Sequence, residues 1–113
     1  MKLTFLILKD AIEKGASEIH YVPEEVRFRI ELLIDGELKP AMEPPRKLRD
    51  ALTARVKEMA GLDVEQRRAP QDGRFVIRIA DGDEVELKVS VRPVPFGEQV
   101  IVRLPRDPNV ARA

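Results

Sequence analysis

Residues 26–36 read VRFRIELLIDG, and this stretch decides the fold class. Side chains alternate along it with a period of two, so successive residues face opposite sides of an extended strand. The set that we expect to point into the core is Val26, Phe28, Ile30, Leu32 and Ile34, and the other set is Arg27, Arg29, Glu31, Leu33 and Asp35. The pair Asp35-Gly36 is a hairpin signal. We therefore expect residues 37–42 to return as an antiparallel strand.

Helical spacing precedes this strand. Residues 3–14 carry a set of positions that predicts one face of a helix, namely Leu3, Leu6, Ile7, Asp10, Ala11 and Lys14. Gly15 follows as a C-cap residue that is free to adopt a positive φ. A short strand is expected over residues 18–22, between this helix and the alternating stretch.

A second helix is predicted after the hairpin. Pro44-Pro45 ends the returning strand and opens a helix to about residue 60, because proline is well tolerated in the first helical turn. The apolar stripe of this helix consists of Leu48, Ala51, Leu52, Val56, Met59 and Ala60. Residues 63–73 show no clean period and are predicted to form an arginine-rich loop.

The last third of the chain alternates again. Two strands are predicted around the turn Asp81-Gly82. Their inward-facing residues are Phe75, Ile77 and Ile79 in the first strand and Val85, Leu87, Val89 and Val91 in the second. A turn is expected over residues 93–97, and a last strand carries Val100, Val102 and Leu104.

This order of elements predicts an α+β fold, an antiparallel sheet with two main helices packed on one face. Residues 1–104 are expected to form a single domain, and the polar residues 105–113 a flexible tail. The opposite face of the sheet is expected to be charged and available to water or to a partner. It carries Arg27, Arg29, Glu31, Glu84, Glu86, Lys88 and Ser90.

The composition excludes several function classes. With 43% hydrophobic and 35% charged residues, the 113-residue chain is typical of one globular domain rather than a disordered segment. A net charge of +0 gives no basic footprint for nucleic acid, and the lack of cysteine excludes disulfides and thiolate chemistry. No segment approaches the roughly 18 apolar residues of a membrane span, so we expect a cytoplasmic protein without direct membrane insertion. The single asparagine, Asn109, favours a thermophilic source.

Motifs of independent enzymes are missing from the sequence. It contains neither the phosphate-binding loop G-x-x-x-x-G-K-[ST] nor the dinucleotide motif G-x-G-x-x-G. His20 is the only histidine, and one histidine cannot build a histidine metal site. Residues 81–84 lack the ligand spacing of a calcium loop and are more typical of a hairpin turn. We therefore expect a chain that is not an enzyme and that alone binds no cofactor or metal.

Several segments, taken in order, resemble a known family. They are Gly15-Ala16-Ser17-Glu18-Ile19-His20, Ile34-Asp35-Gly36, residues 56–64, Arg67-Arg68-Ala69-Pro70-Gln71-Asp72-Gly73-Arg74, Lys88-Val89-Ser90, Phe96-Gly97-Glu98-Gln99-Val100 and Val102-Arg103-Leu104. The family is the motor ATPases of type II secretion and type IV pilus assembly. The resemblance covers residues 11–104 and is to the domain that precedes their phosphate-binding loop.

The resemblance implies a PAS-like fold and a non-catalytic role. In the family this domain packs on the ATPase core of a neighbouring subunit in a hexameric ring, where basic residues reach the neighbour's nucleotide. The matching positions here are Arg74, Lys88 and Arg103, and the partner interface is expected to include Arg67, Arg68, Gln71 and Asp72. The expected partner is therefore a secretion or pilus ATPase core, and ATP and Mg²⁺ would be bound only together with that core.

One departure from the family pattern leaves a second function open. Lys88 stands where the family usually has arginine, and lysine cannot form the bidentate fork that arginine forms with phosphate. The chain is thus either an excised domain or a short protein that kept the fold without the motor. The alternative function is a stand-alone PAS-like regulatory or ligand-sensing module, which would need a core cavity of roughly 300 Å³ or more.

Overall fold

The alternating stretch forms a strand, and the other elements follow in the predicted order. The structure is a computed structural model that describes residues 2–78 and 82–105. Its elements are helix α1 (Lys2–Glu13), strands β1 (Glu18–Pro23), β2 (Phe28–Ile34) and β3 (Glu37–Met42), the short 3-10 helix η1 (Arg46–Leu48), helix α2 (Arg49–Met59), and strands β4 (Gln71–Arg78), β5 (Glu84–Val94) and β6 (Gly97–Arg103).

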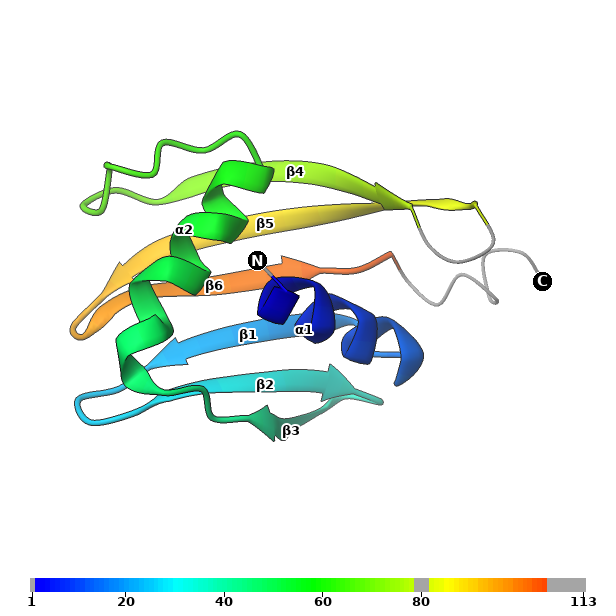
Figure 1. Ribbon diagram of the computed structural model, residues 1–113, viewed down its shortest axis with the longest axis horizontal. Helices are drawn as coiled ribbons and strands as arrows, with labels where there is room; N and C mark the ends of the chain where they lie inside the picture. Colours follow the sequence, from blue (N-terminus) through cyan, green and yellow to red (C-terminus); the bar gives the residue numbers. More distant parts are fainter. Residues whose placement is uncertain (1, 79–81, 106–113) are drawn as a thin grey trace.

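Six strands form one antiparallel sheet in the order β3-β2-β1-β6-β5-β4 (Figure 1). Each half of the chain contributes three neighbouring strands. Strands β1 and β6, which are far apart in the sequence, join the two halves at the centre, where Glu18 pairs with Arg103 and Tyr21 with Val100. The predicted α+β class with an antiparallel sheet is confirmed.

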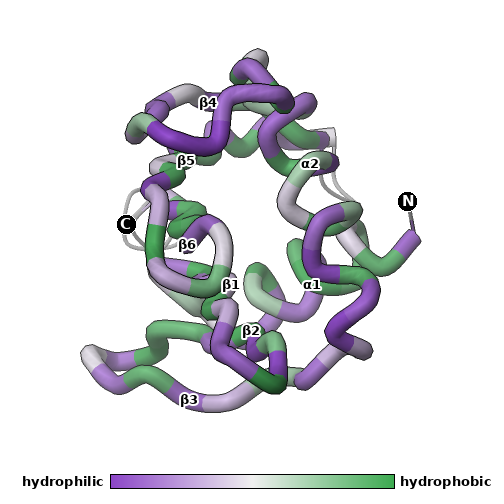
Figure 2. Tube along the Cα trace, turned by 90° about the vertical axis from the view of Figure 1, so that its left-hand side faces the viewer, coloured by the Kyte–Doolittle hydropathy of each residue, from purple (hydrophilic) through white to green (hydrophobic). Residues whose placement is uncertain are grey.

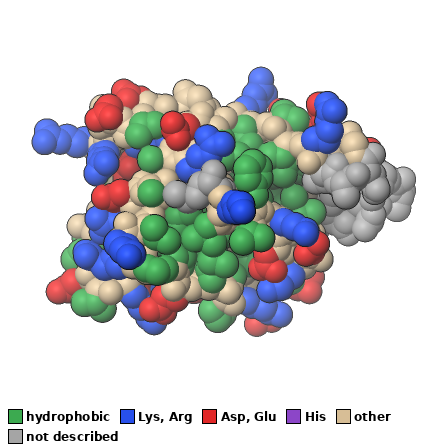
Figure 3. Space-filling view, viewed as in Figure 1, with side chains coloured by type: hydrophobic (Ala, Val, Ile, Leu, Met, Phe, Trp, Pro, Cys, Tyr) green, Lys and Arg blue, Asp and Glu red, His purple; other side chains and the backbone are tan. Residues whose placement is uncertain are grey.

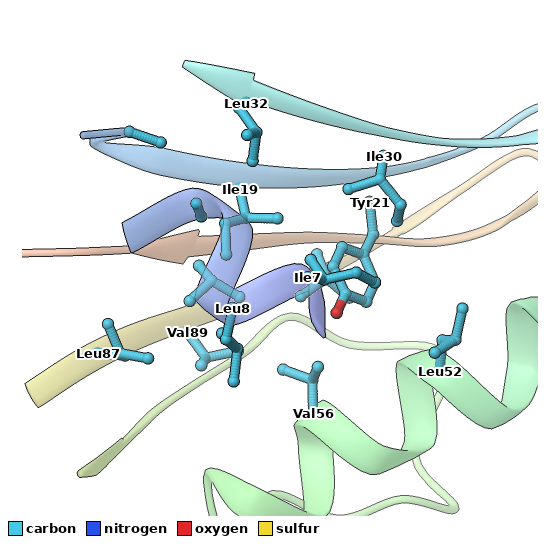
Figure 4. Close-up of a cluster of buried hydrophobic side chains, with 14 of the residues drawn as sticks. Ile7, Leu8, Ile19, Tyr21, Ile30, Leu32, Leu52, Val56, Leu87 and Val89 are labelled. Carbon is cyan, nitrogen blue, oxygen red and sulfur yellow. The ribbon is translucent and has the colours of Figure 1, made fainter. Parts of the chain in front are cut away.

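Both helices lie on the same side of the sheet (Figure 2). Ile7 and Leu8 from α1 and Leu52 and Val56 from α2 point toward the sheet and cover the core on the helix side (Figure 4). The most deeply buried sheet residues that they cover are Ile19, Tyr21, Phe28, Ile30, Leu32, Leu87, Val89, Val91, Val100 and Val102. No helix among the described residues covers the other face of the sheet, which we call the open face (Figure 2).

Helix α1 buries a different stripe from the predicted one. Thr4, Ile7, Leu8 and Ala11 are buried at spacings of three and four residues, whereas Leu6, which was predicted to share one helix face with Ile7 and Ala11, is exposed. Successive helix residues lie about 100° apart around the axis, so a stripe centred on Ile7 and Leu8 leaves Leu6 outside. The predicted grouping of Leu6 with Ile7 and Ala11 is therefore wrong.

Two predicted inward positions are also wrong at the edges of other elements. Val26 is exposed because β2 begins only at Phe28, and the chain before it turns, with the Glu24 N–H donating to the Arg27 carbonyl at 2.8 Å. Ala51 is exposed because Leu52, the next residue along α2, occupies the buried face. Regular α-helix starts at Arg49, after η1, rather than at Pro44-Pro45.

The loops are shorter than predicted. Strand β4 starts at Gln71, because Gln71–Gly73 pair with β5, so the predicted loop over residues 63–73 loses its last three residues. Strand β5 continues to Val94, which narrows the predicted turn over residues 93–97, and β6 ends one residue before Leu104. Ile79, Asp81 and residues 106–113 lie outside the described residues, so their predicted positions stay predictions.

Gly73 lets β4 pass close to the end of α2. A Cβ atom at this position would lie 2.5 Å from the carbonyl oxygen of Ala60 and 2.8 Å from Cδ2 of Leu62. Gly73→Ala is therefore expected to lower the free energy of unfolding by about 1–3 kcal/mol, the usual cost of overpacking, in urea denaturation. Asp72→Ala is the control because the Asp72 side chain is exposed. Equal losses for the two variants would contradict the close approach.

Candidate functional site

Three basic side chains form one row on the open face of the sheet. Arg74 in β4 lies directly opposite Lys88 in β5, and Lys88 lies directly opposite Arg103 in β6. Their neighbours along each strand are buried on the helix side, so the alternation of the strands directs these three cations to the open face. All three are exposed. We call Arg74, Lys88 and Arg103 the basic row.

Acidic groups lie at both ends of the basic row. Arg103 Nε lies 3.5 Å from Glu18 Oε2, and Arg103 Nη1 donates a hydrogen bond to Ser90 Oγ at 2.9 Å. At the other end, Arg74 Nη1 lies 3.7 Å from Glu86 Oε2. Among the described residues, no carboxylate oxygen lies within 4.0 Å of the Lys88 ammonium at the centre.

The basic row is suited to an anion. Like charges directly opposite each other on neighbouring strands repel and destabilise a sheet. The ion pairs at the two ends offset little of this repulsion, because exposed ion pairs are screened by water and salt. An anion that approaches the open face can contact more than one of the three cations. Arg74 and Arg103 each offer a planar fork of donors, and Lys88 offers a point charge between them.

The two predicted loop arginines lie apart from the basic row. Arg67 and Arg68 are exposed on the segment that joins α2 to β4, residues 60–70, which we call the arginine loop. Arg67 lines a hollow of about 240 Å³ together with residues of α2 and with Glu98, so it lies on the helix side of the sheet. The structure therefore does not bring Arg67 and Arg68 together with the basic row.

The helix side has a different chemical character. Hydrophobic side chains gather around the middle of that face, with charged side chains toward its rim (Figure 3). Phe5 and Leu6 of α1 are among the exposed apolar residues of the chain. An anionic ligand is thus better matched by the open face than by the middle of the helix side.

Gln71 and Asp72, the other two predicted interface residues, differ in how available they are. The Asp63 N–H donates to Gln71 Oε1 at 2.9 Å, and Gln71 Nε2 donates to the carbonyl oxygens of Asp63 at 3.0 Å and Gln66 at 3.2 Å. The Gln71 amide is therefore engaged within the chain. Asp72 is exposed on the open face, opposite Ser90.

A buried ion pair was missed by the sequence reasoning. Lys57 of α2 and Glu98 of β6 have side chains that are only 1% and 7% exposed, and Lys57 Nζ lies 3.0 Å from both carboxylate oxygens of Glu98. The sequence contained a signal for the burial of Glu98, because Glu98 lies two and four residues before the buried Val100 and Val102 and so faces the same side of β6. Lys57 likewise follows Val56 directly in the buried part of α2.

A second charged cluster, at the turn before β2, is neutralised internally. Arg29 Nη1 donates to Glu31 Oε2 at 2.6 Å, and Arg29 Nη2 donates to Glu24 Oε2 at 3.1 Å. Hydrogen bonds from Arg27 and then Arg29 lower the pKa of Glu24, and the same contact with Glu24 raises the pKa of Arg27. Each cation of this cluster has an acidic partner, whereas Lys88 in the basic row has none within residues 2–78 and 82–105.

Strand β1 carries two titratable rings, those of His20 and Tyr21. His20 Nε2 lies 2.7 Å from Glu18 Oε1, the same carboxylate that meets Arg103. The hydroxyl of Tyr21 points from the sheet toward the helices (Figure 4), and burial raises the pKa of its phenol. The Glu18 carboxylate thus lies between the His20 ring and Arg103 at one end of the basic row, and the Tyr21 phenol is buried in the core.

Other kinds of site have little support in the part of the chain that the structure describes. Within residues 2–78 and 82–105, no three His, Asp or Glu side chains are grouped to hold a metal ion. Across the same residues, every helix is too short or too polar to cross a bilayer. The 240 Å³ hollow is lined mostly by polar and charged residues, and an open hollow of about 450 Å³ lies on the arginine loop. Neither is the core cavity that a ligand-sensing module would need.

Comparison with known proteins supports the resemblance seen in the sequence. The type IV pilus assembly ATPase PilB of Myxococcus xanthus is 52% identical over 104 residues, which are 92% of this chain and 18% of that protein. The type II secretion system ATPase E of Vibrio cholerae is 43% identical over 112 residues, which are 99% of this chain and 22% of that protein. The chain thus spans about a fifth of the length of these relatives.

A solved structure shares the fold. The pilus retraction motor PilT with bound ADP matches 86% of this chain and 27% of its own chain, with a TM-score of 0.57 and 21% sequence identity. The family model described as "Type II/IV secretion system protein" matches residues 1–112. Because that match covers nearly the whole chain, the chain belongs to the type II/IV secretion system protein family, in which it matches the N-terminal domain of the ATPases.

Proposed function

We propose that the chain is a non-catalytic, PAS-like domain of a type II secretion or type IV pilus motor ATPase, or a stand-alone partner for one. It docks with the open face of β4, β5 and β6 on an adjacent ATPase core, as part of a ring at the cytoplasmic side of the membrane. The observation that carries the proposal is the register that places Arg74, Lys88 and Arg103 side by side.

The chemistry of the basic row fits the phosphates of a nucleotide held by that core. Residues directly opposite in a sheet have Cβ atoms roughly 5 Å apart, so three long side chains can converge on one polyphosphate. Arginine forks bind phosphate oxygens in a bidentate manner, and an arginine supplied by a neighbour makes hydrolysis depend on how the two domains are placed. ATP and Mg²⁺ belong to the core in this proposal, and the chain contributes only side chains.

Further contacts flank the basic row. Asp72 lies on the open face beside it, and Arg67 and Arg68 reach the partner from the arginine loop. Gln71 contributes indirectly, because its amide is engaged in holding that loop.

Arg74→Ala is expected to leave the fold intact and to raise the dissociation constant for an ATP-loaded ATPase core about 10–100-fold. This range corresponds to the loss of a charged hydrogen bond worth about 1.5–3 kcal/mol. Isothermal titration calorimetry with the core in its ATP-bound and nucleotide-free forms measures the effect, which should be larger with ATP.

Arg78→Ala is the matched control for this measurement. Arg78 lies on the same strand and face, its side chain is 72% exposed against 73% for Arg74, and it pairs with Glu84 as Arg74 pairs with Glu86. It stands outside the basic row, so its removal should change affinity less than threefold, well under 1 kcal/mol. Equal effects of the two substitutions would contradict a specific role for the basic row.

A further inference from the structure

The ammonium group of Lys57 contacts the arginine loop as well as Glu98. Lys57 Nζ donates to the carbonyl oxygen of Gln66 at 2.7 Å and lies 3.4 Å from the carbonyl oxygen of Val64. A lysine ammonium has three donors, and these two carbonyl groups together with the Glu98 carboxylate account for all of them. The buried charge is therefore fully coordinated by one acid and the loop backbone.

The loop is also held from its other end. The Gln71 amide forms three hydrogen bonds to the backbone of Asp63 and Gln66. The carbonyl of Gln66, immediately before Arg67, accepts from both Lys57 and Gln71. Two side chains from different elements thus fix the backbone directly before the two loop arginines.

An ion pair alone does not explain why a lysine is buried here. Replacing a buried ion pair by apolar residues of similar volume is often neutral or stabilising, because two charges must be taken out of water. What an apolar pair cannot supply is a donor for the carbonyl oxygens of Val64 and Gln66. The Lys57 ammonium therefore gives the loop hydrogen bonds that a packed hydrophobic contact could not provide.

Arg67 lies directly beside this anchor. It shares the 240 Å³ hollow with Glu98, the partner of Lys57, and with Arg49, Asp50 and Thr53 of α2. A change in the loop backbone at Gln66 is therefore transmitted to Arg67 across a single peptide bond.

We propose that Lys57 is a positioning residue, which with its counter-ion Glu98 and with Gln71 holds the arginine loop so that Arg67 and Arg68 meet the partner ATPase core. This inference rests on the proposed function for what the loop meets, and on the hydrogen bonds above for how the loop is held. Lys57 itself is buried and does not touch the partner.

The double variant Lys57→Met/Glu98→Leu tests the inference. It removes both buried charges together, so no uncompensated charge is left in the core, but it also removes the donor to the loop. The whole 113-residue chain is used, its folding is checked by thermal unfolding, and amide hydrogen exchange is followed residue by residue. We expect exchange of the loop amides at residues 64–68 at least tenfold faster, with the amides of β1 and β6 unchanged.

Gln71→Ala is the second, independent variant, because it releases the same loop without altering the buried pair. It keeps the inference testable if the double variant does not fold. We expect the same faster loop exchange, and for both variants an affinity for the ATP-loaded core reduced about tenfold. Unchanged loop exchange in a folded double variant, or in Gln71→Ala, would overturn the positioning role.

The outcome also separates this inference from the proposed function. Faster loop exchange with unchanged affinity for the core would overturn the role of the held loop in docking, while the effect of Arg74→Ala would still support docking through the basic row. If the native chain does not bind the core at all, the proposed function fails, and with it the docking half of the inference. The exchange data alone then decide whether Lys57 holds the loop.

Discussion

Phe28→Ala is expected to lower the free energy of unfolding by about 3–5 kcal/mol, the range for removing a buried phenylalanine. Phe28 is 0% exposed, lies at the start of β2 and belongs to the hydrophobic core cluster. Its ring meets Tyr21 edge-on, with centroids 5.9 Å apart, so the substitution removes an aromatic pair as well as core volume. Urea denaturation followed by far-UV circular dichroism measures the loss.

Phe5→Ala is the matched control for this substitution. The same atoms are removed, but the Phe5 side chain is 53% exposed on α1, so we expect a change within about 0.5 kcal/mol. Similar losses for the two variants would mean that Phe28 is not the buried anchor of β2, and the interpretation of residues 26–36 as a half-buried strand would then be wrong.

Local patterns predicted the strands well because a period of two is a strong signal. The inward positions Phe28, Ile30 and Leu32 are buried as expected. The prediction that Val26 points inward failed because the alternation in the sequence extends into a turn, where the backbone no longer has strand geometry. Periodicity therefore identified the element and missed its first residue.

Long-range pairing could not be predicted in the same way. The contact between β1 and β6 joins residues about 80 positions apart, for example Glu18 and Arg103, and no local pattern encodes it. The register that aligns Arg74, Lys88 and Arg103 depends on the lengths of two turns. The family resemblance supplied the three residues, whereas their arrangement as a row came only from the structure.

The buried pair Lys57–Glu98 shows a different limit. Both residues lie in segments that carry the family resemblance, and both lie close in the sequence to buried apolar residues. Charged residues are usually exposed, so neither residue alone indicates a buried position. Only the packing of α2 against β6 shows that the two buried charges, each of which is improbable alone, neutralise each other.

Lys57→Met alone is expected to lower the free energy of unfolding by about 3–5 kcal/mol, because it leaves the Glu98 carboxylate buried without a counter-ion. Methionine has a similar length and fills the space, so packing is changed little. The carbonyl oxygen of Val64 loses the Lys57 donor at the same time, and that of Gln66 keeps only the Gln71 donor. Urea denaturation at neutral pH measures the loss.

Lys47→Met, at an exposed position of η1, is the control and should stay within about 0.5 kcal/mol of the native chain. The double variant Lys57→Met/Glu98→Leu should regain most of the stability lost by Lys57→Met, because the unpaired carboxylate is removed. If the single variant is as stable as the double one, Glu98 is not a buried charge that depends on Lys57. The double variant can regain stability while its loop amides still exchange fast. The stability lost by Lys57→Met then comes from the unpaired Glu98 carboxylate, and the order of the arginine loop depends on the hydrogen bonds that the Lys57 ammonium donates.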